Sequence, residues 1–173
     1  MMNSEVIYYE RQHFKQWSLW LLMGGINAIF ITGCVKQLFL GHPFGNNPMS
    51  DTALIIVSAS MFLLTALLFY MTLNTVINKE GIYVWFHPVQ FRKKYFSWEE
   101  IERVYIRKYS PVREYGGWGN RIGFGGKSGS AYNMYGNIGL QIILKNSNKL
   151  LIGTSNPDGM TAILKKIGKL ETD

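Results

Sequence analysis

The chain has 173 residues, enough for one domain of ordinary size and a small second one, so two independent enzymatic domains are excluded. Only 17% of its residues are charged, against about 25% in soluble domains, which indicates that apolar residues are concentrated in part of the chain. Residues 1–73 carry three Lys/Arg and three acidic residues, whereas residues 74–173 carry 15 and 8, so the net charge of +7 arises in the second half. The single cysteine, Cys34, excludes an internal disulfide and a cysteine-based zinc site.

Two uncharged apolar segments follow a polar flank, from Trp17 to Val35 and from Ala53 to Leu73. Each has about the 20 residues that a helix needs to cross a bilayer. Neither shows the polar stripe that is typical of a helix in a soluble core. We therefore predict a helical transmembrane hairpin. Its expected parts are the flank 1–16, the hairpin 17–73 with spans at about 17–38 and 53–73, and a short external loop at 39–52.

Lysine and arginine residues near the ends of the spans predict the orientation of the hairpin. Arg11 and Lys15 precede the first span, and Lys79 and the run Arg92-Lys93-Lys94 follow the second, whereas the connecting loop has only Lys36. Positive residues are enriched in the cytoplasmic loops of membrane proteins. We therefore expect both termini to be cytoplasmic.

Small residues within the two spans indicate that the helices pack closely, either in the hairpin or between protomers of a homo-oligomer. Asn27 is the one strongly polar side chain at depth, and we expect it to form a hydrogen bond with a Ser or Thr of the other helix. The residues expected in helix packing are Gly24, Gly25, Asn27, Ala28, Ser58 and Ser60.

From Thr75 onward, short runs of β-forming residues are separated by turn signals, a pattern that is typical of antiparallel sheets. The clearest hairpin has Asn146-Ser147-Asn148 as its turn. Asn156 and Pro157 then predict the start of a C-terminal helix. The expected strands are 75–78, 81–87, 91–96, 101–109, 120–124, 131–135, 139–145 and 149–154, which predicts seven to eight antiparallel strands.

Such strands followed by one helix have the outline of a pleckstrin-homology-like (PH-like) barrel capped by that helix. The segments Val76–Val84, with its Glu80-Gly81-Ile82 turn, and Phe96–Val104, with Trp98-Glu99-Glu100-Ile101, resemble bacterial PH-like domains. The whole chain is similar in layout to functionally uncharacterised bacterial membrane proteins with two transmembrane helices before such a domain. The resemblance implies a PH-like domain over residues 74–173, a place in the bacterial cytoplasmic (inner) membrane, and no shared catalytic residues.

The segment 110–135 is rich in glycine, aromatic and basic residues and departs from a minimal PH-like pattern. It reads as a long hairpin insertion with two alternative roles. Its aromatic side chains either pack on each other and on the barrel, or form a surface that contacts a protein partner or lipid. The candidate contact residues are Arg113, Tyr115, Trp118, Arg121, Phe124, Tyr132 and Tyr135.

The other motifs do not indicate catalysis, a cofactor or a metal. The run Gly126-Lys127-Ser128 ends like a phosphate-binding loop, but the first glycine of that motif is replaced by Arg121 and no helix is expected after it. The three histidines lie in separate regions. Glu99, Glu100 and Glu102 alternate across the expected strand and form a solvated acidic corner. We expect no catalytic, cofactor-binding or metal-binding residues.

The basic run Arg92, Lys93 and Lys94 is the expected lipid-facing site, because a Lys or Arg near an anionic leaflet gains about 1 kcal/mol. We expect a membrane-anchored, non-enzymatic module for binding or assembly, which contacts anionic lipid head groups and a protein partner or a second copy of itself. The alternative is an accessory subunit of a membrane enzyme or transporter complex. Nucleic acid is not an expected partner, because no groove-reading helix or stacking platform is evident.

Overall fold

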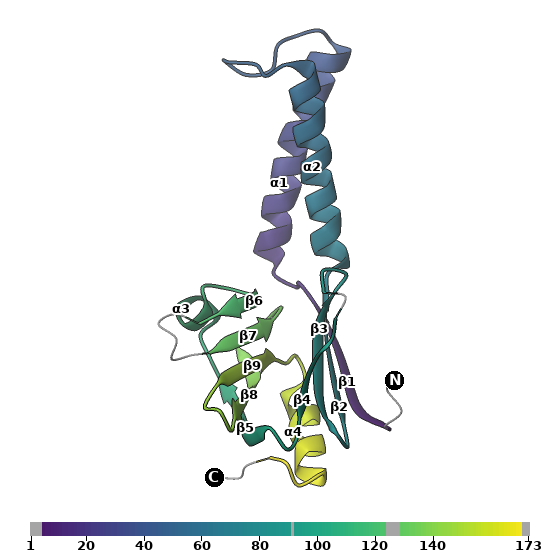
Figure 1. The fold of residues 1–173 in the computed structure, drawn as a ribbon. Coiled ribbons are helices and arrows are strands. Elements are labelled where there is room, and N and C mark those ends of the chain that lie inside the picture. The colour runs from purple at the N-terminus through teal and green to yellow at the C-terminus, as the bar shows by residue number, and fades with distance from the viewer. Residues whose placement is uncertain (1–4, 91, 124–128, 171–173) are drawn as a thin grey trace. The chain divides into compact units, whose positions relative to one another are not determined.

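The computed structural model describes residues 5–90, 92–123 and 129–170. The chain forms two compact units (Figure 1). The helical unit spans Gln16–Tyr70, and the sheet unit combines Met1–Lys15 with Met71–Asp173. The sheet unit is therefore discontinuous in sequence, with the helical unit inserted after its first strand.

The helical unit consists of α1 (Trp17–Cys34), the π-helical turn η1 (Val35–Phe39) and α2 (Asp51–Tyr70). The continuous helices Trp17–Phe39 and Asp51–Tyr70 are long and apolar enough to cross a membrane. Most of their side chains are exposed, and only 17% and 11% of the residues in their apolar windows are buried. A core helix of a soluble protein has most of its apolar side chains covered, which is not the case here.

The four-stranded sheet has the order β1-β2-β3-β4, and all its pairs are antiparallel. The first strand, β1, belongs to the flank 1–16, where no strand was expected. It pairs along its whole length with the strand that follows α2, from Val6 opposite Asn78 to His13 opposite Thr72. The second span also ends earlier than expected, because Leu73 lies in β2 and is fully buried in the sheet unit. The strands are β1 (Val6–His13), β2 (Thr72–Asn78), β3 (Gly81–His87) and β4 (Lys94–Ser97).

The five-stranded sheet has the order β5-β8-β9-β7-β6. Its β7–β9 pair is parallel and its other pairs are antiparallel. Among the described strands no ladder joins the two sheets, so the expectation of a closed, fully antiparallel barrel is wrong. The strands are β5 (Ile101–Lys108), β6 (Gly119–Ile122), β7 (Ser130–Asn133), β8 (Ile138–Leu144) and β9 (Lys149–Gly153).

One hydrophobic core lies between the sheets. It takes alternating residues from both, such as Ile82 and Val84 from β3 and Leu140 and Ile142 from β8. The predicted C-terminal helix is confirmed as α4 (Pro157–Lys166), which adds two fully buried side chains, Met160 and Leu164. Asn156 caps this helix by accepting a hydrogen bond from the Gly159 amide at 3.0 Å.

The segment 110–135 is only partly a hairpin. It begins with a short helix, α3 (Pro111–Tyr115), that the sequence pattern did not indicate. Gly116 ends this helix with a φ of 70°, a left-handed conformation that glycine adopts without strain. The β6–β7 hairpin follows, with the amide of Gly123 bonded to the carbonyl of Gly129 at 2.6 Å. The residues between these two glycines lie outside the described part of the chain.

Candidate functional site

The two faces of the four-stranded sheet carry different chemistry, because successive side chains of a strand point to opposite faces. On β1, Glu10 and Gln12 point inward and are buried, whereas Tyr9 and Arg11 point outward and are exposed. On β3, Val84 and Phe86 point inward, and Tyr83 and Trp85 point outward. The outer face therefore gathers aromatic and basic side chains from three strands and the loop before β4.

We name this outer surface the aromatic–basic face and define it as Tyr9, Arg11, Tyr83, Trp85, Lys93 and Tyr95. The rings of Tyr83 and Tyr95 stack with their centroids 4.5 Å apart, and Lys93 Nζ lies 4.5 Å from the centre of the Trp85 ring. The Tyr9 hydroxyl donates a hydrogen bond of 2.8 Å to Asn74 Oδ1. Tyr9 and Tyr95 keep 54% and 43% of their surface exposed.

One end of the four-stranded sheet is separated from both helices by only a few residues of sequence. Thr72 is paired with His13 on one side and with His87 on the other. Thr72 follows the last residue of α2 by two positions, and His13 precedes the first residue of α1 by four. The connections between the two units are therefore short in sequence, with one residue between α2 and Thr72 and three residues between His13 and α1.

Buried polar contacts hold β1 to the rest of the sheet unit. The Glu10 carboxylate accepts hydrogen bonds from the hydroxyls of Tyr8, Thr154 and Ser155 and from the Ser155 amide, at 2.6–2.8 Å. Gln12 Nε2 donates to the Gly153 carbonyl at 2.6 Å. Burial, followed by the hydrogen bond with Glu10, raises the pKa of Tyr8. The strand before α1 is thereby joined to the connection between β9 and α4.

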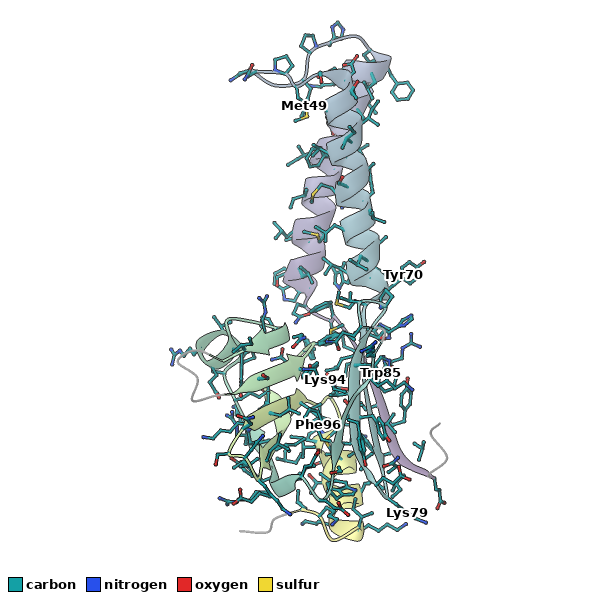
Figure 2. All side chains as sticks on the ribbon, in the orientation of Figure 1. Met49, Tyr70, Lys79, Trp85, Lys94 and Phe96 are labelled. Carbon is teal, nitrogen blue, oxygen red and sulfur yellow. The ribbon has the colours of Figure 1, made fainter. Side chains whose placement is uncertain are left out.

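The basic run expected to face lipid is divided between two surfaces. Arg92 and Lys93 are exposed in the loop before β4, and Lys93 joins the aromatic–basic face through Trp85. Lys94 is paired with the inward-facing Val84 and points toward the five-stranded sheet, with its Nζ 5.6 Å from the centre of the Tyr132 ring. Figure 2 labels Lys94 and Phe96 on the side of the four-stranded sheet that faces the other sheet.

A pocket of about 570 Å³ lies where Lys94 meets the five-stranded sheet. Lys94 and Phe96 contribute one wall, and residues of β7, β9 and the β8–β9 turn contribute the other, among them Tyr132 and Lys149. The described residues that line it include no Asp or Glu. The Tyr132 hydroxyl is buried and has no hydrogen-bond partner among the described residues.

The expected contact residues of segment 110–135 are partly buried in the sheet unit. Tyr115 and Tyr132 are only 2% and 1% exposed, so they do not form an exposed contact surface. Tyr115 packs with Tyr109, Ala131 and Leu151 on the outer face of the five-stranded sheet. Trp118 donates its indole N–H to the Gly136 carbonyl at 3.1 Å and is half-buried. The exposed members are Arg113, Arg121 and Tyr135, and Phe124 lies outside the described residues.

The short helix α3 is held in place by an ion pair. Arg107 Nη2 lies 2.7 Å from Glu114 Oε2, and the Arg107 Nε donates to Gln141 on β8 at 2.9 Å. The hydrogen bond from Arg107 lowers the pKa of Glu114. Burial raises the pKa of Tyr109 to about 12, and burial likewise raises the pKa of Tyr115. These contacts fasten the segment to the sheet.

Two of the expected helix-packing residues lie between α1 and α2. Asn27 is buried and donates to Thr65 Oγ1 at 2.8 Å and to the Met23 carbonyl at 2.7 Å, so the predicted hydrogen bond to the other helix is confirmed. Ser58 is buried beside Cys34, whose Sγ lies 3.3 Å from its hydroxyl. The others do not lie at this helix contact: Gly24, Gly25, Ala28 and Ser60 are exposed in the described chain.

The remaining functional questions concern metals and known relatives. Within the described residues, no group of three or more His, Cys, Asp or Glu side chains is placed to hold a metal ion. No family model, no curated protein and no solved structure matches the chain. Function is therefore argued from the surfaces and pockets of the chain itself.

Proposed function

We propose that the protein is a non-enzymatic binding module anchored by two transmembrane helices, with a PH-like sheet unit in the cytoplasm of a bacterium. In this proposal the aromatic–basic face lies against the anionic inner leaflet and orients the sheet unit at the membrane. The rest of the surface is then presented to a protein partner or to a second copy of the chain.

The pairing of β1 with β2 is the observation that carries the proposal. These strands flank the two helices in sequence and lie side by side in one sheet. If the helices cross a bilayer, both connections therefore emerge on the same side and attach to one folded unit. Two attachments restrict rotation of that unit much more than a single linker does.

The composition of the aromatic–basic face suits a membrane interface. Tyrosine and tryptophan are enriched at the head-group level because their rings are amphipathic. Arg11, Arg92 and Lys93 lie on or beside this face, and each gains about 1 kcal/mol near an anionic leaflet. The chain already holds the unit at the membrane, so this attraction acts on orientation.

Neutron reflectometry on supported bilayers tests the orientation. The full-length protein is compared in phosphatidylglycerol-containing and in purely phosphatidylcholine bilayers, as wild type and as the Arg11→Glu/Lys93→Glu double variant. The wild type is expected to hold its sheet unit closer to the anionic bilayer, and the double variant is expected to lose this difference.

The matched control is Lys165→Glu/Lys166→Glu on α4, which changes the net charge by the same amount at exposed positions. This control should behave as the wild type. An unchanged profile in the Arg11→Glu/Lys93→Glu variant, or an equal change in both variants, would remove the lipid contact from the proposal.

A protein contact is supported by a separate observation on β6. This strand is an edge of the five-stranded sheet, and its Ile122 is 81% exposed. Unpaired edges with apolar side chains are sites where another strand can add. The contact is consistent with self-assembly and with an accessory subunit of a larger membrane complex. If it joins two copies, Ile122→Asp should lower the mass of the protein in detergent; an unchanged mass would argue against self-assembly there.

A further inference from the structure

We propose that the pocket between the two sheets binds a small organic phosphate with an apolar body. The pocket faces inward from the four-stranded sheet, whereas the aromatic–basic face is on the opposite side of the same strands. The proposal therefore does not depend on the membrane contact, and each can fail without the other.

The charge of the pocket selects an anion. Lys94 lines it from β4 with an inward-facing side chain, whereas strand alternation directs the side chain of Lys149 to the outer face that carries Leu151. Lys94 forms no ion pair with a residue that the structure describes, and the described lining has no acidic side chain. Lysine ammonium groups are also established partners of phosphate.

The hydrogen-bond donors of the pocket fit an oxyanion with several acceptor atoms. Ser130, Ser147 and Asn148 line it with hydroxyl and amide groups. Tyr132 lines it as well, and its buried hydroxyl has no partner among the described residues. That hydroxyl has almost no accessible surface, so the donors open to a ligand are those of Ser130, Ser147 and Asn148.

The remaining lining sets the size and the apolar part of the ligand. Phe96, Leu144 and Leu150 supply apolar surface beside Lys94. A volume of about 570 Å³ lies within the usual range for small-molecule sites, about 300–1,000 Å³. An inorganic ion would leave most of this space empty. A phosphate ester with an aromatic or short aliphatic group fits the mixture of lysine and hydrocarbon.

The backbone at the pocket rim leaves no room for larger side chains. Gly129 has a φ of 72°, and a Cβ at this position would clash with the Lys149 carbonyl. Glycine is therefore required where β7 begins beside β9. The close approach of these two strands places Ser130 next to Leu150 in the parallel pair, so the wall that β7 and β9 form is fixed at this end of the pocket.

Calorimetric titration of the full-length protein tests the site. The protein is kept in dodecyl maltoside, which carries neither charge nor phosphate, and phenyl phosphate is the probe. Binding is expected for phenyl phosphate and is expected to be weaker for inorganic phosphate. The Lys94→Gln variant should lose at least tenfold in affinity, whereas the control Lys145→Gln, with the same change in charge at an exposed position, should bind as the wild type.

Two further arms define the ligand. Phosphatidic acid added to the micelles displaces phenyl phosphate if a lipid head group enters the pocket, and leaves it bound if the natural ligand is a soluble phosphate; both results require the site. Ser130→Ala is expected to weaken binding several-fold, because it removes a hydroxyl that lines the pocket on the same side of β7 as the inward-facing Tyr132.

The proposal is overturned if phenyl phosphate does not bind the wild type at millimolar concentration. An equal loss of affinity in the pocket variant and in the control also overturns it, since general charge attraction then explains binding. The Arg11→Glu/Lys93→Glu variant should retain phenyl phosphate binding, which separates failure of this site from failure of the membrane contact.

Discussion

The two sheets share one core, but their outer faces differ. The outer face of the five-stranded sheet is covered by Tyr109 and Tyr115, which pack on Ala131 and Leu151. The four-stranded sheet presents Tyr9, Tyr95 and its other aromatic and basic side chains at its outer surface. Aromatic residues are abundant on both faces, yet they serve stability on one and remain accessible on the other.

This difference indicates where to look for function in an aromatic-rich chain. Aromatic content alone leaves open whether segment 110–135 packs on the sheet or forms a contact surface, and its Tyr115 is packed on the sheet beside the Arg107–Glu114 ion pair. The accessible aromatic side chains lie instead on the four-stranded sheet, such as Tyr9 on β1 and Tyr95 on β4. The predictions below separate a covering role from a contact role.

Loss of the covering tyrosine should have the largest effect on stability. Tyr115→Ala removes a fully buried ring from the outer face of the five-stranded sheet and should lower the free energy of unfolding by about 3–4 kcal/mol. Thermal unfolding in detergent micelles measures the loss. The control Tyr135→Ala removes an exposed tyrosine of the same segment and should cost less than about 1 kcal/mol. Equal losses would contradict the covering role of Tyr115.

Loss of the buried carboxylate on β1 should have the next largest effect. Glu10→Ala leaves the hydroxyl and amide donors that surround the carboxylate without their acceptor. It should lower the free energy of unfolding by about 2–3 kcal/mol, measured by thermal unfolding in detergent micelles. Glu5→Ala is the control, because Glu5 forms an exposed ion pair with Lys79 and its loss should cost at most about 0.5 kcal/mol. If Glu10→Ala is as mild as the control, β1 is not an integral strand of the sheet.

The ion pair between Arg107 and Glu114, which holds α3 on the sheet, should make the smallest contribution to the free energy of unfolding. This contribution should depend on pH. Arg107 depresses the pKa of Glu114 below its ordinary value of 4.5. The ion pair therefore stabilises the folded protein fully above pH 4.5, and this stabilisation disappears as the pH falls through the depressed pKa. Glu114→Gln should therefore lower stability by about 0.5–1 kcal/mol at neutral pH. Unfolding curves of both proteins should converge in acid. A difference that persists there would show that charge is not the cause.

Much of the fold is predictable because its periodicity is strong. The uncharged segments identify both helices, and the strands around the Asn146-Ser147-Asn148 turn are confirmed as β8 and β9. In the Trp98-Glu99-Glu100-Ile101 segment, Trp98 and Ile101 pack with the core while Glu99 and Glu100 are exposed, which agrees with the solvated acidic corner that the sequence predicts. These elements are specified by local patterns of apolar residues and turns.

The missed elements depend on contacts distant in sequence. Strand β1 buries Glu10 and Gln12 instead of apolar residues, because their partners are polar groups near residues 153–155. Only the β-forming run Val6-Ile7-Tyr8-Tyr9 at its start signals a strand. The parallel β7–β9 pair has no local signal either. It joins strands separated by β8 in sequence, which prevents the simple antiparallel barrel that the strand count suggests.

The candidate sites are predictable in composition but not in placement. The basic run Arg92-Lys93-Lys94 is evident in the sequence, yet β4 begins only at Lys94. Alternation across the strand then directs Lys93 toward Trp85 on the outside and Lys94 toward Tyr132 on the inside. One basic run thus supplies a lysine to each face of the sheet. A shift of one residue in the register of β4 would exchange the faces to which Lys93 and Lys94 point.

The most direct test of the membrane contact compares labels on the two outer faces. In a Cys34→Ser background, an environment-sensitive fluorophore is attached at Tyr95→Cys on the aromatic–basic face or at Val112→Cys, an exposed position of α3. Nanodiscs of phosphatidylglycerol with a quencher on the lipid head group report proximity to the leaflet. The proposal predicts strong quenching at position 95 and weak quenching at position 112. Equal quenching at both positions, or stronger quenching at position 112, would contradict it.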